Sequence, residues 1–213
     1  GLLPGRTYEL LAGDDEGNLL EDRRFQSFDT DEKEVRISIL GGLRLGNAAA
    51  RANLLARALE SRPQLLVLAG STVDATLPLP LASLKAREAR DFFFTRQAEA
   101  RLHLELGLAR DLVPIVAQWN DDEFGHRDGD RSFPQRDQAQ EMLELFFPHW
   151  ADQSTIIEGP GITLEIKLPN QSLEVVDDLS FRQPSAPGEE VCSTPRGRKK
   201  EVCRPGKPVP APQ

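Results

Sequence analysis

The sequence predicts an α/β fold in which a parallel sheet is layered with helices. Three apolar runs, at 35–40, 65–69 and 113–117, have the length and composition of buried strands. They alternate with two apolar-faced stretches, 47–60 and 83–110, that are long enough to be helices. This alternation is typical of parallel strands joined by right-handed helical crossovers. We therefore expect three parallel strands, with the first helix crossing over between the first two.

The first 30 residues are expected to form two strands joined by a turn. Thr7–Leu11 and Arg24–Phe28 have strand character, and the polar stretch Gly13–Gly17 lies between them. Two strands alone are only marginally stable in water, so this segment must pack on something. We therefore expect the rings of Tyr8 and Phe25 to be buried against the main domain or a neighbouring chain.

The sequence indicates where the predicted helices begin and end. Asn47 has a side chain suited to an N-cap of the first helix, and Pro63 follows the end of that helix. The long stretch 83–110 is rich in Ala, Leu, Arg and Glu and is expected to be helical. The third strand leads through an acidic segment to a helix at 135–147, which Pro148 ends.

The pattern then returns to strands and ends in a tail. Residues 162–167 and 172–176 alternate apolar and polar side chains around a Pro-Asn pair, which predicts an antiparallel hairpin. From Ser180 onward Pro, Gly and charged residues dominate. Both cysteines, Cys192 and Cys203, lie in this tail. They form one disulfide in an oxidising compartment or stay as two free thiols in the cytosol.

Composition and charge narrow the classes of function. The chain has 213 residues, of which 39% are hydrophobic and 28% are charged, as in globular proteins. A net charge of −8 and a pI of about 5.0 argue against a broad basic face for nucleic acid. No apolar run reaches the length of a membrane span. Gly1 is not a natural start, which is compatible with a processed chain.

Three polar loops follow the three predicted strands. They are Gly41–Asn47, Gly70–Thr76 and the acidic segment Trp119–Arg131. The carboxyl ends of parallel strands open on one edge of a sheet, where such folds place their ligands. Clustered carboxylates there suit a divalent cation or metal-held phosphate chemistry. The alternative is that the acidic segment is a solvated loop and that Ser71 and Thr72 cap a turn.

The acidic segment also resembles a known motif. Trp119-Asn120-Asp121-Asp122-Glu123-Phe124-Gly125, followed by Asp128-Gly129 and Phe133-Pro134, is similar to the W-D-D-H-[DE]-[YF]-G segment of the PhoD-like (alkaline phosphatase D) metallophosphoesterases. Gly70-Ser71-Thr72 falls where that family has G-D-N. The resemblance covers about residues 1 to 178. It implies a metallophosphoesterase-like sheet layered with helices, preceded by the remnant of a small β-sandwich domain.

This chain departs from the family pattern at positions where the family binds metal or catalyses the reaction. The family has a metal-binding Asp where this chain has Ser71, and a catalytic His where it has Asp122. It usually has a Cys after the first strand, where this chain has Gly41-Gly42. A later half with a G-D-x-H segment is absent, because only ten residues separate Trp150 from Gly161. A two-metal hydrolase holds the attacking and leaving oxygens between cations, so at least one metal position should be lost.

Domain boundaries and site residues follow from the resemblance. We expect a β-sandwich (fibronectin III-like) remnant at 1–32, a shortened PhoD-like metallophosphatase-like domain at 33–178, and a Pro- and charge-rich tail at 179–213. Candidate catalytic residues are Asp122 and His126. The candidate metal ligands are oxygen donors of the two polar loops, namely Asp121, Asp122, Glu123, Asp128, Ser71 and Asp74.

Two functions are compatible with these residues. The first is a degenerate phosphatase-like protein that acts as a binding or structural subunit, with a protein partner covering the N-terminal strands and an exposed sheet edge. The alternative is a metal-dependent phosphomonoesterase or phosphodiesterase with an altered site, acting on a phosphate ester. The cofactor would be a divalent metal ion (Ca, Mg, Mn or Fe), or none. We expect a periplasmic or extracellular location, with the cytoplasm as the alternative.

Overall fold

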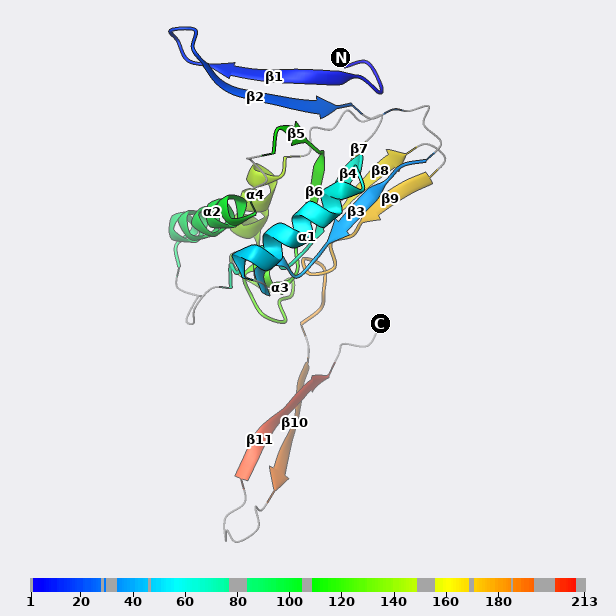
Figure 1. The fold of residues 1–213 in the computed structure, drawn as a ribbon. Coiled ribbons are helices and arrows are strands. Elements are labelled where there is room, and N and C mark those ends of the chain that lie inside the picture. Colours follow the sequence, from blue (N-terminus) through cyan, green and yellow to red (C-terminus); the bar gives the residue numbers. More distant parts are fainter. Residues whose placement is uncertain are drawn as a thin grey trace.

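The computed structural model describes residues 2–27, 29, 34–45, 47–76, 84–104, 109–148, 156–168, 171–184, 186–193 and 202–209, with backbone alone for 45, 186–193 and 202–209. This part is mixed α/β, with four α-helices and four small sheets (Figure 1). The elements are β1 (Thr7–Gly13), β2 (Leu19–Gln26), β3 (Ile37–Leu40), the 3₁₀ turn η1 (Leu43–Leu45), α1 (Ala48–Glu60), β4 (Leu65–Ala69), α2 (Ala86–His103), β5 (Asp111–Leu112), β6 (Ile115–Gln118), α3 (Asp121–Phe124), α4 (Arg136–Phe146), β7 (Ile156–Glu158), β8 (Leu164–Leu168), β9 (Gln171–Val175), β10 (Ala186–Ser193) and β11 (Val202–Val209).

The central sheet has the order β3-β4-β6, and both pairings are parallel. The predicted parallel strands and the crossover through α1 are therefore confirmed. Asn47 caps α1 as expected, because its Oδ1 accepts a hydrogen bond of 2.9 Å from the amide of Ala50. The middle strand β4 is buried on both faces, which explains its continuous apolar sequence.

The two faces of β4 pack into two different cores. Leu66 and Leu68 lie on the face covered by the helices, together with Phe93 of α2 and Met142 of α4. Leu65 and Val67 lie on the opposite face, against apolar side chains of β8 and β9. The sheet of β7, β8 and β9 is antiparallel, so the hairpin predicted from residues 162–176 is confirmed. Its Pro-Asn turn lies outside the described residues.

The N-terminal hairpin joins the body through one short strand. β1 and β2 pair antiparallel, and β2 also pairs in parallel with the two-residue strand β5. Tyr8 and Phe25 stack with ring centroids 5.6 Å apart and are half-buried rather than enclosed. Four leucines of the hairpin are more than half exposed: Leu10, Leu11, Leu19 and Leu20.

Several predicted elements differ from the observed ones. The second hairpin strand, predicted at 24–28, is β2 at Leu19–Gln26. The strand predicted at 113–117 is wrong at its first two residues, because β5 ends at Leu112 and β6 begins at Ile115. Pro114 has no amide hydrogen, which explains the break. The helix predicted at 83–110 is shorter, since α2 spans Ala86–His103; residues 83 and 105–108 lie outside the described part. The acidic segment contains the one-turn helix α3, where a loop was expected.

The tail strands β10 and β11 pair antiparallel, with the Cα of Cys192 opposite that of Cys203. The side chains of both cysteines lie outside the described part, so the predicted disulfide stays a prediction. Within the described residues, none of the helices is both long and apolar enough to cross a membrane.

Candidate functional site

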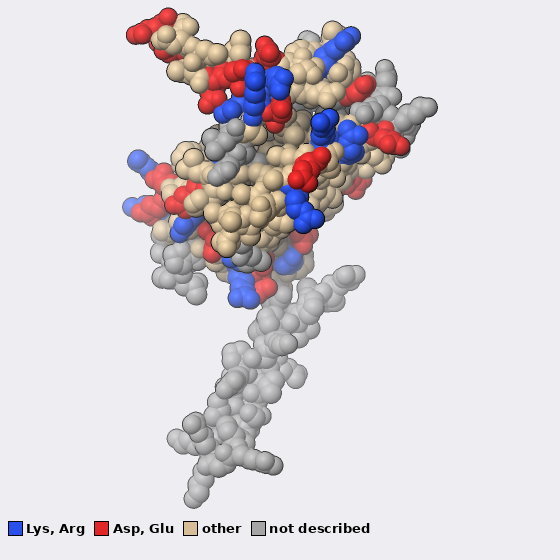
Figure 2. Space-filling view, in the orientation of Figure 1, with Lys and Arg blue, Asp and Glu red and all other residues tan. Residues whose placement is uncertain are grey.

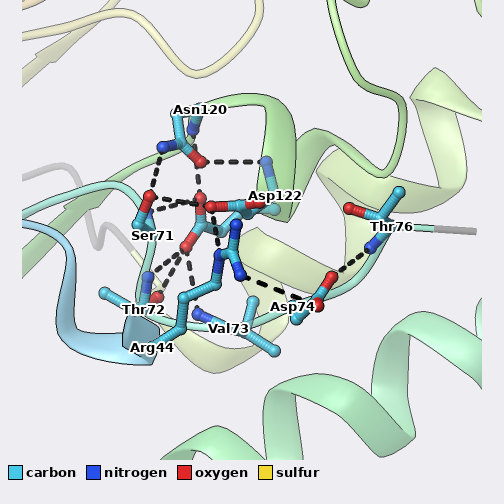
Figure 3. A network of polar contacts seen from close by, with 9 residues as sticks. Arg44, Ser71, Thr72, Val73, Asp74, Thr76, Asn120 and Asp122 are labelled. Carbon is cyan, nitrogen blue, oxygen red and sulfur yellow. Dashed lines mark hydrogen bonds and ion pairs between the residues drawn. The ribbon is translucent and has the colours of Figure 1, made fainter. Parts of the chain in front are cut away.

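The three loops that follow the parallel strands meet at one edge of the central sheet (Figure 3). The first loop contains η1 with Arg44, the second begins at Gly70, and the third leads through Asn120 into α3. Two backbone hydrogen bonds join the first two loops, from Gly42 to the Gly70 carbonyl (3.2 Å) and from Arg44 to the Ser71 carbonyl (2.7 Å). The predicted convergence of the loops is therefore observed.

The second loop has an unusual backbone. Gly70 and Ser71 both have positive φ angles, of 76° and 53°. A side chain at Gly70 would place its Cβ 2.9 Å from the Cβ of Asn120, so glycine is needed for the close approach of the two loops. Ser71 adopts the left-handed conformation in spite of its side chain, at an energetic cost. This turn directs three successive amide groups inward, and such an arrangement binds an anion.

The anion in this turn is the carboxylate of Glu123. Its side chain accepts five hydrogen bonds, from the amides of Ser71 (3.0 Å), Thr72 (2.5 Å), Val73 (3.2 Å) and Asn120 (3.1 Å) and from the Thr72 hydroxyl (2.8 Å). Glu123 is only 1% exposed. Burial raises its pKa above the ordinary value, although these hydrogen bonds act in the opposite direction. Glu123 therefore binds the neighbouring loop to α3 rather than offering oxygens to a ligand.

Asp122 is bound to a cation of the chain itself. The Nε of Arg44 lies 2.5 Å from its Oδ2, and the Ser71 hydroxyl donates to the same oxygen at 2.8 Å. The hydrogen bond to Asp122 is the main cause of the raised pKa of Arg44. The other side of the guanidinium lies 3.8 Å from an oxygen of Asp74. The guanidinium of Arg44 therefore lies between two of the carboxylates at this edge, those of Asp122 and Asp74 (Figure 3).

The end of the third loop is fixed by local hydrogen bonds. Asn120 is the N-cap of α3, and its Oδ1 accepts a 2.9 Å hydrogen bond from the amide of Asp122. Its side-chain nitrogen donates to the Ser71 hydroxyl at 2.5 Å. Gly125 ends the helix with a φ of 92°. This capping explains why four residues that were expected to be a loop form a helical turn.

The other predicted residues lie apart from this network. Asp121 accepts a hydrogen bond of 3.1 Å from the amide of Asp128, which itself has a positive φ of 52°. The ring of His126 packs against Phe133, with centroids 5.5 Å apart. The structure therefore brings together Ser71, Asp122 and Glu123, with Asp74 at the rim. It does not bring His126, Asp121 or Asp128 into the same network.

Most carboxylate oxygens of Glu123 and Asp122 are already occupied by donors of the protein itself. Both oxygens of Glu123 are occupied by hydrogen-bond donors, and one oxygen of Asp122 is shared by a guanidinium and a hydroxyl. Ser71 contributes a neutral hydroxyl, which is a weak replacement for a bridging carboxylate. Across the described ranges, no group of three or more His, Cys, Asp or Glu side chains is arranged to hold a metal ion.

Sequence reasoning missed three residues that matter at this edge. Arg44 and Asn120 stand in the predicted loops, and a cation among converging acidic loops is the signal that could have pointed to Arg44. Asp177 is 3% exposed and accepts hydrogen bonds from Trp119 Nε1 (2.9 Å) and the amide of Ile162 (3.2 Å). It ties the start of the acidic segment to the chain beyond β9, and nothing in the local sequence indicates this long-range contact.

Comparison with known proteins does not assign the chain to a family. No protein-family model matches the chain, and no curated protein matches it. The PhoD-like resemblance therefore rests on the motif residues of the sequence alone.

Proposed function

We propose that this chain is a degenerate PhoD-like phosphatase-related protein that acts as a binding or structural subunit and not as a hydrolase. The observation that carries the proposal is the ion pair between Arg44 and Asp122, 2.5 Å long. The guanidinium lies on the carboxylate that stands where the family has its catalytic histidine. The proposal includes a metallophosphoesterase-like layering of the central sheet and a β-sandwich remnant in β1 and β2.

The chemistry of the site supports the non-hydrolytic half of the proposal. A carboxylate that is paired with a guanidinium has no proton to give to a leaving group. Glu123 is occupied by the loop that it stabilises, so the oxygens that a two-metal mechanism would need are used in holding the fold. Asp122 and Glu123, which resemble catalytic-site residues of the family, thus stabilise the fold of this chain.

The surface of the N-terminal hairpin supports the binding half. Four of its leucines are more than half exposed: Leu10, Leu11, Leu19 and Leu20. In the described part of the chain, β1 and β3 each lie at the edge of a sheet with one side unpaired. Exposed apolar side chains beside an open strand edge favour contact with another polypeptide. We further propose a periplasmic or extracellular location, in keeping with the predicted disulfide.

The proposal is tested by hydrolysis and metal binding of the purified chain. A chromogenic phosphomonoester and a phosphodiester are offered with Ca²⁺, Mg²⁺, Mn²⁺ or Fe²⁺ in turn, while calorimetry follows cation binding. We expect no metal-dependent turnover from the native chain. Arg44→Gln removes the internal cation, so it should raise cation affinity without creating turnover. Arg87→Gln, at a side chain that is 91% exposed on α2, is the matched control for charge.

One outcome would overturn the proposal directly. Metal-dependent turnover by the native chain that disappears in Asp121→Ala would identify an enzyme with an altered site.

A further inference from the structure

A cleft of about 710 Å³ lies at the edge of the central sheet opposite to the candidate site. Its walls come from β2, from the segment 109–114 and from the residues just before β3 and β4. The volume is within the range of clefts that hold small molecules, roughly 300–1,000 Å³. Four arginines line it, Arg24, Arg36, Arg62 and Arg110, against a single carboxylate, Asp111.

This concentration of positive charge contrasts with the rest of the chain, whose net charge is −8. Two of the four arginines are neutralised by acids: Arg24 lies 2.9 Å from Asp111, and Arg110 lies 2.9 Å from Asp22. Arg36 and Arg62 have no carboxylate partner within the portion of the chain that the structure describes. Figure 2 shows Lys and Arg side chains both on the N-terminal hairpin and on the facing part of the body.

Two further features of the lining residues are costly and find no explanation in the fold. Arg62 follows the C-cap of α1 and has a φ of 48°, a position that helices usually give to glycine. The Nε of Arg24 is buried and has no hydrogen-bond partner among the described residues. A buried donor without a partner destabilises the fold unless a ligand or water satisfies it. Both features belong to guanidinium-bearing residues of the same cleft.

We infer that this cleft binds a small organic anion that carries carboxylate or phosphate groups. Arg36 and Arg62 supply positive charge that no carboxylate of the described residues neutralises. Guanidinium groups match both kinds of oxyanion with paired hydrogen bonds. Phe25, Leu59 and Val113 give the same cleft an apolar wall for the carbon skeleton of the ligand. The inference is independent of the proposed function, because it concerns the other edge of the sheet.

Isothermal titration calorimetry of the full chain tests this inference with two probes. Citrate carries only carboxylates, and pyrophosphate carries only phosphates, so the two arms distinguish the sources of the anionic group. We expect at least one probe to bind in a saturable way, and the binding to weaken as sodium chloride is raised. Binding of citrate alone or of pyrophosphate alone identifies the group that the cleft prefers, and each result supports the inference.

The variant Arg62→Gly separates binding from folding. It removes the guanidinium and also relieves the positive φ, so its thermal stability should equal or exceed that of the native chain. Its affinity for the probe should nevertheless fall by about tenfold, the loss expected for one charge-assisted contact. Arg36→Gln should show a similar loss. Arg87→Gln removes the same charge from an exposed site on α2 and should change affinity by less than about twofold.

Three results would overturn the inference. The first is that neither probe binds to the native chain at millimolar concentration. The second is that Arg87→Gln weakens binding as much as Arg62→Gly, which would indicate non-specific attraction. The third is that an acidic peptide such as hexaglutamate binds while both small anions do not, which would identify the cleft as a protein-docking surface.

Discussion

The carboxylate of Glu123 offers the sharpest test of how the candidate site is built. In Glu123→Gln the shape is kept, but one oxygen becomes an NH₂ group. If the amide oxygen keeps the three contacts of Oε1, the NH₂ group faces the amides of Ser71 and Asn120, which bind Oε2 at 3.0 and 3.1 Å. Two partly buried amide donors then face a third donor, and two hydrogen bonds to a charged group are lost.

The size of the effect follows from those two bonds. Each hydrogen bond to a charged group contributes about 1.5–3 kcal/mol, so the gross loss is about 3–6 kcal/mol. Removing the buried charge offsets part of this loss of free energy, because burial disfavours the ionised carboxylate and raises its pKa. We therefore expect Glu123→Gln to lower the free energy of unfolding by about 2–4 kcal/mol, a large part of the 5–15 kcal/mol typical of a domain.

Urea unfolding followed by circular dichroism measures this loss. The matched control is Glu141→Gln, which changes an ion-paired carboxylate that is 48% exposed and should cost less than about 1 kcal/mol. A loss of less than about 0.5 kcal/mol in Glu123→Gln would refute the reasoning, because it would mean that the loop does not depend on this carboxylate.

Four more predictions follow from other contacts. Arg44→Gln should lower the free energy of unfolding by about 1–2 kcal/mol, measured by urea unfolding, since it leaves a largely buried carboxylate without its cation. Asp177→Ala should cost about 2–4 kcal/mol in the same assay, because three donors lose their acceptor. Hydrogen bonds from Asn18 hold the pKa of Asp14 below its ordinary value, so the contribution of this carboxylate to the hairpin turn should be present above that ordinary pKa and be lost as the pH falls through the folded pKa. Nuclear magnetic resonance titration of the turn amides checks this. Thiol titration of the native, unreduced chain should find Cys192 and Cys203 unreactive, and two reactive thiols would exclude the disulfide.

The parts of the fold that were predictable from sequence depend on local patterns. The continuous apolar run of β4 indicates a strand covered on both faces, and the side chain of Asn47 fits the start of α1. The division between β5 and β6 was not predicted, because the apolar run continues through Pro114 and conceals the missing amide hydrogen. Helix α3 was missed because its four residues are mostly charged, and its capping depends on the placement of Asn120.

The candidate site was predictable in position but not in chemistry. Strand order alone brings the three loops to one edge, so the meeting of Ser71 with Asp122 could be expected. The role of Glu123 depends on the positive φ of Ser71, which turns the amides of the loop inward and which no residue pattern specifies. Arg44 lies 78 positions from Asp122 in the sequence, and only the folded chain reveals the pairing.

The short parallel pairing of β2 with β5 has a consequence for how the molecule opens. Two residue pairs, Arg24 with Asp111 and Phe25 with Leu112, form this ladder between the hairpin and the body. A unit held by so short a ladder can detach while the central sheet stays intact, so its amide hydrogens should exchange with solvent before those of β4. Detachment would also separate the two walls of the arginine-lined cleft. An anion bound between the two walls would therefore stabilise the attached state of the hairpin. It should slow amide exchange in β2 while leaving exchange in β4 unchanged.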